Sequence, residues 1–355
     1  MYSSQYMKIV NEVAAGKSCN EICDSLNISR KQLYYYMQLL KNDGIDFNRK
    51  YYSNGVIRYS PISKLRDMKD GLNQINLITP HGTGSEMFLV ISDTHFGNEK
   101  ERIDLLNRAY NYAIKNGIHI ILIAGDLLDG NYTLGVKERE FGEIVKQIEH
   151  FLKDYPFDKN IINIAVLGDH DYSVLNGHFV NLKEVINSKR HDIAVGGFNS
   201  VSVGVKNDNI MLFHHLTNGA IPPIYAPIIL KGHSHYFSVN HRDDSTLDVT
   251  VPSLSDIKDV LPSALVLEVE FNDGYISEAD VKQVLFLDKD YVVSTYRYTF
   301  NRNIGEKIIP IKNEERIPQE IIKEDVENNG RVLKKKKGER VVVDAKGNCW
   351  CYRFL

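Results

Sequence analysis

The sequence predicts a layered α/β domain, with a small helical unit before it and a small β-containing extension after it. In the middle of the chain, short apolar runs alternate with amphipathic stretches of helix length, which is typical of a parallel sheet covered by helices. Five of the apolar runs are followed at once by aspartate or histidine. We therefore expect polar side chains to gather where these strands end.

The composition is that of a soluble globular protein with more than one domain. The chain has 355 residues, of which 43% are apolar and 25% charged, with a formal net charge of −3. This charge favours neither nucleic acid nor a membrane surface, so any basic patch must be local. No apolar run approaches the roughly 20 residues that cross a bilayer, and no signal peptide is recognised. We expect a cytoplasmic protein without a membrane partner, whose four cysteines are reduced thiols.

Residues 1–60 predict three helices followed by a β-hairpin. Ser18 can cap the second helix, with Glu21 at the capping-box position. The third helix is predicted over residues 30–41, and Ser53-Asn54-Gly55 is a hairpin turn signal. The whole unit resembles the winged helix-turn-helix of bacterial transcription regulators of the biotin-repressor type.

The winged-helix resemblance implies contacts with DNA. The third helix would face the major groove or its phosphates, and the hairpin would be the wing. The residues that it assigns to these contacts are Arg30, Lys31, Tyr34 and Tyr35 on the helix, and Lys50 and Arg58 on the wing. A solvated polar face and a protein-binding module are the alternatives for this unit.

The remaining chain divides into three parts. Residues 61–85 mix proline, glycine and short polar runs, and are predicted to be a linker. The α/β domain spans residues 86–285, because fully apolar runs there predict buried strands and apolar residues three and four apart predict helices. The predicted strands are 87–91, 118–124, 161–167, a pair within 193–205, 210–213, 228–230, 247–251 and 264–271, and the predicted helices are 103–113, 141–151 and 182–186.

Residues 286–355 are predicted to form a C-terminal extension with a basic segment. Lys334–Lys337 precedes the apolar Val341–Val343, and a turn signal follows. This order predicts a hairpin whose basic edge discourages pairing with other chains. Contact with a phosphate backbone is the alternative.

The residues at the strand ends predict a metal site. The carboxyl ends of neighbouring strands meet at one edge of a sheet, so residues distant in sequence can converge there. The candidate ligands are Asp93, His95, Asp126, Asp169, His214, His233 and His235. These donors suffice for two divalent ions bridged by one carboxylate. Two ions about 4 Å apart can clamp a phosphoryl group and activate a water.

The motifs also resemble a known family. In chain order they are Asp-x-His at 93–95, Gly-Asp-x-x-Asp at 125–129, Gly-Asp-His-Asp at 168–171, a strand-end histidine at 214 and Gly-His-x-His at 232–235. Together they resemble the calcineurin-like metallophosphoesterases over about residues 86–270. Within that superfamily, SDTHFG and GDLLDG are most similar to the Mre11/SbcD-like nuclease branch. The resemblance implies a β-sandwich flanked by helices and a centre with two divalent ions. Mn²⁺ is the expected ion, with Fe, Zn, Ni and Mg as alternatives.

The family resemblance also assigns roles. One ion would be held by Asp93, His95, Asp126 and His235, and the other by Asp126, Asp169, His214 and His233. His170 and Asp171 are the residues assigned to catalysis: His170 would reach the phosphate or the leaving group, and Asp171 would orient histidines. Asp129 would orient histidines as well, or would cap the following segment. His214 is preferred to His215 because it directly follows the strand, and His215 stays an alternative.

Asp169 departs from the family pattern, which has asparagine in Gly-Asn-His-Asp/Glu. The added carboxylate leaves one formal positive charge on the loaded site, where the family pattern leaves two. The site should bind hard cations more tightly, whereas its attraction for a phosphate should weaken. Two hypotheses follow: the site works with Mn²⁺ at reduced activity, or the substitution inactivates it.

The sequence thus favours a binuclear phosphodiesterase, with DNA as the favoured nucleic-acid partner and the winged helix as its guide. A homodimer is left open. One alternative is a phosphoesterase for small molecules or phosphoproteins. The other is a DNA-binding regulator whose metal site is weakened or inactive.

Overall fold

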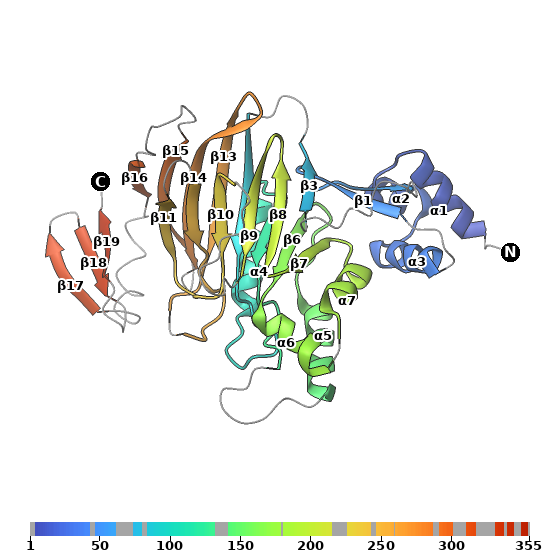
Figure 1. The fold of residues 1–355 in the computed structure, drawn as a ribbon, viewed down its shortest axis with the longest axis horizontal. Coiled ribbons are helices and arrows are strands. Elements are labelled where there is room, and N and C mark those ends of the chain that lie inside the picture. Colours follow the sequence, from blue (N-terminus) through green and yellow to red (C-terminus); the bar gives the residue numbers. More distant parts are fainter. Residues whose placement is uncertain are drawn as a thin grey trace.

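The protein is built on two large β-sheets packed face to face. The computed structural model describes residues 4–42, 47–61, 74–79, 84–131, 141–178, 180–214, 226–242, 246–258, 260–286, 291–300, 310–316, 331–336, 339–343 and 349–353. In these ranges, two sheets have eight strands each and a third has three. The N-terminal helices lie at one end of the molecule and the three-stranded sheet at the other (Figure 1). The prediction of a layered α/β fold is confirmed.

The first large sheet, which we call the central sheet, has the order β16-β15-β14-β13-β4-β5-β6-β7. Its parallel strands are β4 (Ser85–Ile91), β5 (Ile120–Ala124), β6 (Ile162–Leu167) and β7 (Ile193–Phe198). Its antiparallel strands are β13 (Ser263–Asn272), β14 (Tyr275–Phe286), β15 (Tyr291–Thr299) and β16 (Pro310–Arg316). In β4, Phe88 and Val90 belong to one hydrophobic cluster and Leu89 and Ile91 to another. This alternation shows why the run is apolar throughout: both faces of the strand are buried.

The second sheet covers one face of the central sheet. Its order is β11 (Ser238–Arg242), β12 (Thr246–Thr250), β10 (Ile228–Lys231), β9 (Asp208–Phe213), β8 (Ser200–Val205), β3 (Gln74–Ile78), β1 (Phe47–Tyr52) and β2 (Ile57–Pro61). Val203, Leu212 and Leu230 from this sheet share one cluster with Phe88 and Val90. The core between the sheets is therefore a sandwich of alternating apolar side chains.

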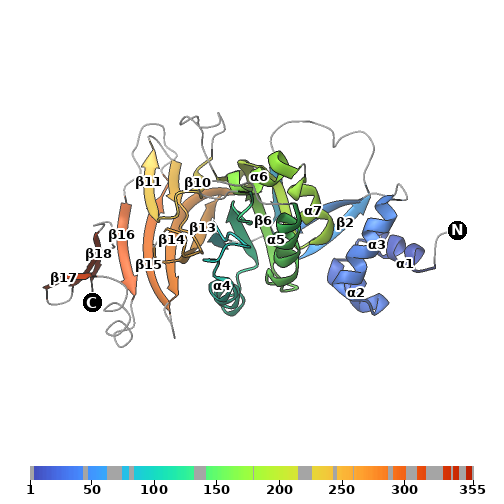
Figure 2. The same cartoon turned by 90° about the horizontal axis from the view of Figure 1, so that it is seen from below.

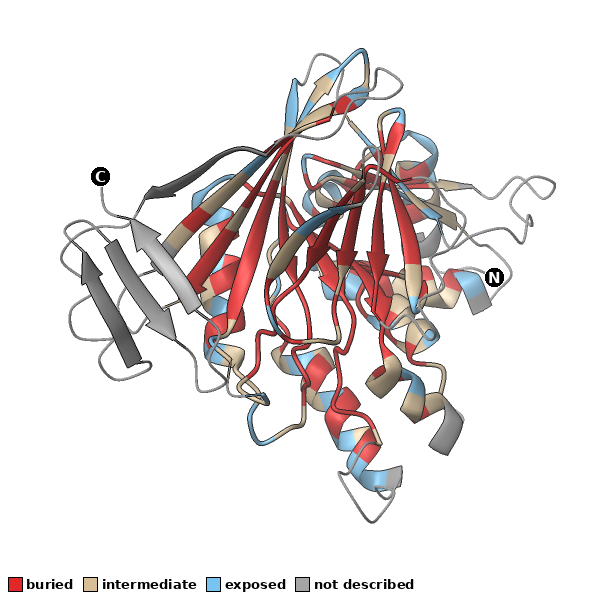
Figure 3. Ribbon diagram, turned by 60° about the vertical axis from the view of Figure 1, so that its left-hand side comes forward, coloured by how far each residue is buried: buried red, intermediate tan, exposed pale blue. Residues whose placement is uncertain are grey.

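Helices cover the other face of the central sheet. They are α4 (Ile103–Lys115), α5 (Phe141–Asp154) and α7 (Leu182–Lys189), and Leu106, Phe151 and Ile186 pack with Leu89 and Ile91. Figure 3 shows buried residues running through the strands in the middle of the molecule and along one side of these helices. A further helix, α6 (Asp169–His178), was not predicted.

The N-terminal unit has the predicted three helices and hairpin. The helices are α1 (Ser4–Ala14), α2 (Cys19–Leu26) and α3 (Arg30–Asn42), and β1 and β2 pair antiparallel. The capping box of α2 is confirmed, because the Ser18 hydroxyl accepts from the Glu21 amide and the Glu21 carboxylate accepts from the Ser18 amide. Figure 2 shows these helices grouped beside β2.

This unit is joined to the sandwich through its strands. β3 pairs in parallel with both β1 and β8, so the second sheet runs without a break into the hairpin. Leu33 and Leu40 of α3 belong to the same hydrophobic cluster as Phe88. The linker expectation for residues 61–85 therefore does not hold for Gln74–Ile78, which is β3, nor for Ser85, where β4 begins.

The C-terminal part continues the sheet arrangement. β15 and β16 extend the central sheet beyond residue 285. β18 (Glu339–Val343) pairs antiparallel with β19 (Cys349–Arg353), and β17 (Arg331–Lys336) is an edge strand of the three-stranded sheet. Lys337 lies outside the described residues. Among the described residues, no helix combines the length and apolarity that a membrane span requires.

The hairpin turn of the N-terminal unit makes a testable contact with the sandwich. Gly55 has a φ of +78°, and a Cβ there would lie 1.8 Å from the carbonyl oxygen of Asn160. We expect Gly55→Ala to lower the free energy of unfolding in urea by about 2–4 kcal/mol, because left-handed strain and overpacking add. Gly16→Ala is the matched control, since Gly16 has a φ of +74° with nothing within 4 Å. Equal losses for the two variants would show that the hairpin does not pack there.

Candidate metal centre

The seven predicted ligands converge where five strands end. Asp93 and His95 follow β4, Asp126 follows β5, and Asp169 follows β6, all in the central sheet. His214 follows β9, and His233 and His235 follow β10, in the second sheet. Their ligand atoms form two groups able to hold a metal ion, Asp126–Asp169–His214–His233 and Asp93–His95–His235. Both sheets therefore contribute to one site.

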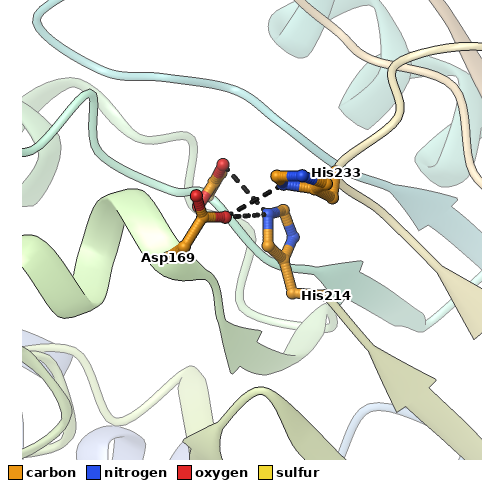
Figure 4. A group of neighbouring side chains, drawn as sticks. Asp169, His214 and His233 are labelled. Atoms are coloured by element: carbon orange, nitrogen blue, oxygen red, sulfur yellow. Dashed lines mark hydrogen bonds and ion pairs between the residues drawn. The ribbon is translucent and has the colours of Figure 1, made fainter. Parts of the chain in front are cut away.

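The first group is held around one imidazole. His214 Nε2 lies 3.0 Å from Asp126 Oδ2 and 3.1 Å from Asp169 Oδ1. His233 Nδ1 lies 3.0 Å from the same Asp169 oxygen. Figure 4 shows Asp169, His214 and His233 with these side chains turned toward one another.

The second group lies beside the first. His235 Nε2 is 3.2 Å and His95 Nε2 is 3.7 Å from Asp93 Oδ1. His95 Nε2 is also 3.9 Å from Asp126 Oδ2, the oxygen that faces His214. Asp126 thus reaches both groups, as expected of a carboxylate that bridges two ions.

Glycines make room for the His214 ring. A Cβ on Gly125 would lie 2.2 Å from His214 Nδ1, and one on Gly168 would lie 2.5 Å from His214 Cδ2. His214 Nδ1 contacts the Ala124 carbonyl oxygen at 2.6 Å, so Nδ1 carries the proton and Nε2 faces the site. The glycines that precede the aspartates in the sequence are therefore required by packing.

Five of the candidate ligands have an uncommon backbone conformation. Their φ values are 53° for Asp93, 46° for His95, 51° for Asp126, 69° for His233 and 71° for His235. Left-handed backbone costs a non-glycine residue roughly 1–2 kcal/mol, and it persists only where the surroundings enforce it. Strain is thus concentrated at the candidate ligands.

The electrostatics of the site suit a cation. Within the described part of the chain, the buried atoms Asp93 Oδ1, Asp126 Oδ2 and His214 Nε2 make ion-pair contacts but no hydrogen bond of good geometry. Burial alone would raise the pKa of Asp93, but His235, His95 and His214 together hold this pKa well below its usual value. Burial alone would lower the pKa of His214, but Asp126 and Asp169 hold it well above its usual value. The residues therefore fit divalent ions, which would take the place of the imidazole proton beside ionised carboxylates.

His170 lies at the same site. Its backbone amide donates to Asp126 Oδ1 at 3.0 Å, and its ring centroid is 4.6 Å from that of His95. Its Nδ1 lies 2.7 Å from the Asp129 carbonyl oxygen, so this nitrogen carries a proton and Nε2 is the one that can exchange a proton with a substrate. Asp129 Oδ1 is 3.8 Å from His95 Nδ1 and 3.9 Å from His170 Nδ1, which places it between two histidines.

Asp171 has a different role from the predicted one. Its carboxylate accepts hydrogen bonds from the backbone amides of Leu127, Leu128 and Gly168, at 2.9–3.1 Å. Burial, with the nearby charge of Asp126, raises its pKa to about 7. Because these described hydrogen bonds go to amides rather than to a histidine, Asp171 fastens the loop after β5 to the start of α6. It positions Asp126 instead of orienting an imidazole.

Some supporting contacts have no signal in the sequence. The Asn98 side chain donates to Asp129 Oδ1 at 2.8 Å, and the Ser253 hydroxyl donates to the Asp93 carbonyl oxygen at 3.1 Å. Ser253 is 160 residues from Asp93, so only the fold reveals the pair. His215 lies outside the described residues.

The predicted DNA-contacting face of α3 partly contacts the sandwich instead. Tyr34 is only 6% exposed, and its ring stacks on His191 with centroids 4.2 Å apart. Arg30 donates to Asn20 Oδ1 at 2.8 Å and to the Tyr34 hydroxyl at 3.1 Å. The expectation that Tyr34 faces a groove is therefore wrong, and Arg30 is held beside it.

The other residues assigned to DNA differ in exposure. Arg58 on β2 donates to the Gly16 carbonyl and lies 3.8 Å from Glu21, so it ties the hairpin to the helices. Lys31, Tyr35 and Lys50 are exposed. Of the six residues assigned to DNA contacts, only these three have exposed side chains.

A network of partly exposed charged side chains supports the loop that carries His95. Glu101 accepts from the Gly97 amide at 2.7 Å and contacts His150 Nε2 at 2.8 Å. His150 Nδ1 contacts Asp154 at 2.8 Å. Burial is the largest single effect and opposes the charged form, but Glu101 and Asp154 together outweigh it and raise the pKa of His150.

This network predicts a pH-dependent contribution to stability. Because the His150 pKa is higher in the folded than in the unfolded state, its contribution is fully present below about pH 6.5, the unfolded value. It is lost as the pH rises through the folded value. We expect His150→Gln to lower the free energy of unfolding by about 0.5–1 kcal/mol at pH 5.5, a value reduced for partial exposure. The difference from the parent should shrink by pH 9, and a difference independent of pH in urea titrations would contradict this account.

Comparison with known proteins identifies the region that contains the centre. Residues 87–261 match the family model for calcineurin-like phosphoesterases. This range includes all seven candidate ligands, His170 and Asp171. No curated protein matches the chain.

Several solved structures are similar. Vps29 from Chaetomium thermophilum is 15% identical, covering 61% of this chain and 97% of that chain with a TM-score of 0.37. A dimetal phosphatase from Danio rerio is 9% identical, covering 61% and 99% with a TM-score of 0.39. A 5′-nucleotidase from Candida albicans is 12% identical, covering 52% and 47% with a TM-score of 0.31.

Proposed function

We propose that this chain, which carries a calcineurin-like phosphoesterase domain at residues 87–261, is a binuclear metal-dependent phosphodiesterase that cleaves nucleic acid. The observation that carries the proposal is the convergence of seven aspartate and histidine side chains at five strand ends. Mn²⁺ is the proposed ion, and DNA the favoured substrate. The Mre11/SbcD-like motifs around Asp93 and Asp126 support the nuclease assignment.

The chain's own residues would divide the work of hydrolysis. Asp93, His95, Asp126 and His235 would hold one ion, and Asp126, Asp169, His214 and His233 the other. The ions would acidify a water and offset the charge of the phosphoryl group. As the water oxygen bonds to phosphorus, the bond from phosphorus to the leaving oxygen breaks.

His170 would supply the proton for that leaving oxygen. A nucleotide alkoxide is a poor leaving group, so a general acid at this place speeds its departure. The Asp129 carbonyl fixes the His170 ring through Nδ1, which leaves Nε2 to deliver the proton. The proton released by the attacking water restores the histidine.

We further propose that the N-terminal unit is a winged helix that guides nucleic acid. Three helices followed by an antiparallel hairpin support this assignment. Lys31, Tyr35 and Lys50 would make the contacts, because Arg30 and Tyr34 are held at the sandwich. The exposed side chains are two lysines and one tyrosine, which suit phosphates and sugars more than base edges.

The role of His170 can be tested on labelled single- and double-stranded DNA and RNA. With Mn²⁺, we expect His170→Ala to lower the cleavage rate about 10²- to 10⁴-fold while binding persists, since a general acid contributes on that order. EDTA should abolish cleavage by the parent. Lys115→Gln, an exposed change on α4, serves as a control with parental activity.

The outcomes of this panel separate the alternatives. Hydrolysis of small phosphoesters alone would replace the nuclease proposal with a small-molecule or phosphoprotein phosphoesterase. Binding of DNA without cleavage under any metal would indicate a regulator with an inactive centre.

The regulator is favoured by one observation, the carboxylate at Asp169. Asp169 Oδ1 lies 3.1 Å from His214 and 3.0 Å from His233, where an asparagine oxygen could take the same place. The substitution therefore changes the charge of the centre without requiring another geometry. A second negative charge facing the same imidazole should weaken the attraction for phosphate.

Asp169→Asn tests the cost of this charge. With bis-p-nitrophenyl phosphate and Mn²⁺, we expect kcat/KM to rise about 10-fold, because removing one charge near the phosphoryl group is worth roughly 1–1.5 kcal/mol. The Mn²⁺ concentration needed for half-maximal activity should rise as well. A fall in kcat/KM at saturating Mn²⁺ would instead show that the aspartate is a working ligand that the reaction requires.

A further inference from the structure

A lysine that follows β12 lies at the edge of the candidate metal centre. The segment before it is fixed against the ligand loops: the Ser253 amide donates to the His235 carbonyl at 3.1 Å, and the Leu254 amide to the Ser92 carbonyl at 3.0 Å. A little further on, Lys258 Nζ donates to the His233 carbonyl oxygen at 3.2 Å. His233 and His235 are both candidate ligands, so the chain holds this ammonium group beside the centre.

The surroundings of Lys258 leave its charge uncompensated among the described residues. Lys258 is exposed, and its one described hydrogen bond is to a neutral carbonyl. The nearby Asp256 pairs with Arg102 at 2.8 Å. An ammonium group has three N–H donors, so further donors can reach an anion.

Asp169 adds a third carboxylate to the centre, and a nearby cation would offset its charge. Three carboxylates, Asp93, Asp126 and Asp169, face the ligand histidines. An additional carboxylate repels the negative oxygens of a phosphoryl group, and one lysine at the edge adds the opposite charge.

We propose that Lys258 binds a phosphoryl oxygen of the substrate and thereby offsets the negative charge of Asp169. The inference rests on the proposed function for the identity of the bound group, a phosphate ester. Lys258 acts as a specificity-determining residue for anionic substrates. It takes no part in bond breaking.

Binding of inorganic phosphate to the full-length Mn²⁺-loaded protein tests the proposal without using activity. In calorimetric titrations, we expect Lys258→Gln to weaken phosphate binding about 5- to 10-fold, the usual effect of a charge-assisted hydrogen bond near the surface. Lys258→Arg should stay within about threefold of the parent. Metal content, measured on each sample, should be unchanged in both variants.

The matched control is Lys115→Gln, which removes the same charge from an exposed position at the end of α4. Because α4 runs back from the end of β4 to the start of β5, Lys115 lies at the edge of the sheet opposite the ligands. We expect phosphate binding by this variant to equal that of the parent.

Combining Lys258 with Asp169 tests the charge balance. Asp169→Asn should tighten phosphate binding, and the double variant Asp169→Asn/Lys258→Gln should return to within about threefold of the parent, because the two substitutions change the charge that faces phosphate in opposite directions. The inference is overturned if Lys258→Gln binds phosphate like Lys115→Gln, or if the parent does not bind phosphate.

Activity separates this inference from the proposed function. Hydrolysis with a phosphate affinity independent of Lys258 would refute the inference and leave the proposed function standing. The expected binding pattern without hydrolysis of any phosphoester would refute the proposed function and support Lys258 as part of a phosphate-binding site.

Discussion

The imidazole of His214 joins the two sheets at the centre. The residue directly follows β9 of the second sheet, but its Nδ1 contacts the carbonyl of Ala124 in β5. Its Nε2 faces Asp126 and Asp169, which follow β5 and β6 of the central sheet. Gly125 and Gly168 leave the space that the ring occupies. A shift of one sheet relative to the other would therefore move the candidate ligands that follow one sheet away from those that follow the other. The apolar sandwich beneath the site keeps the two sheets in register, so packing and chemistry are linked through this one side chain.

The convergence of the candidate ligands could be predicted because each has a local signal in the sequence. A strand buried on both faces is an unbroken apolar run, and the polar residue after it marks the point where the chain leaves the sheet. Once parallel strands are assumed, their ends must meet, so Asp93, Asp126 and His214 could be grouped without coordinates. The same reasoning could not find β3 (Gln74–Ile78), whose sequence QINLI lies between glycine- and proline-containing segments and gains its partners from β1 and β8.

Other features depended on contacts across long separations. The helix pattern placed Tyr34 on α3 correctly, but whether its ring faces DNA or the sandwich depends on His191, which no local rule connects to it. The family resemblance assigned Asp171 to orienting histidines, whereas its described hydrogen bonds go to backbone amides. For both residues, the sequence indicated a polar or aromatic side chain able to make a specific contact, but it did not indicate which group the side chain contacts. Partners are fixed by the tertiary fold rather than by sequence neighbours.

The pairing of β3 between β1 and β8 has a mechanical consequence. A unit tethered by a flexible linker would move independently, with a reach set by the length of the tether. Here the helices are attached through a row of backbone hydrogen bonds to the sheet that also carries His214 and His233. A force applied to the helices by a bound partner would be transmitted along the sheet. A flexible linker would instead extend under that force and transmit little of it.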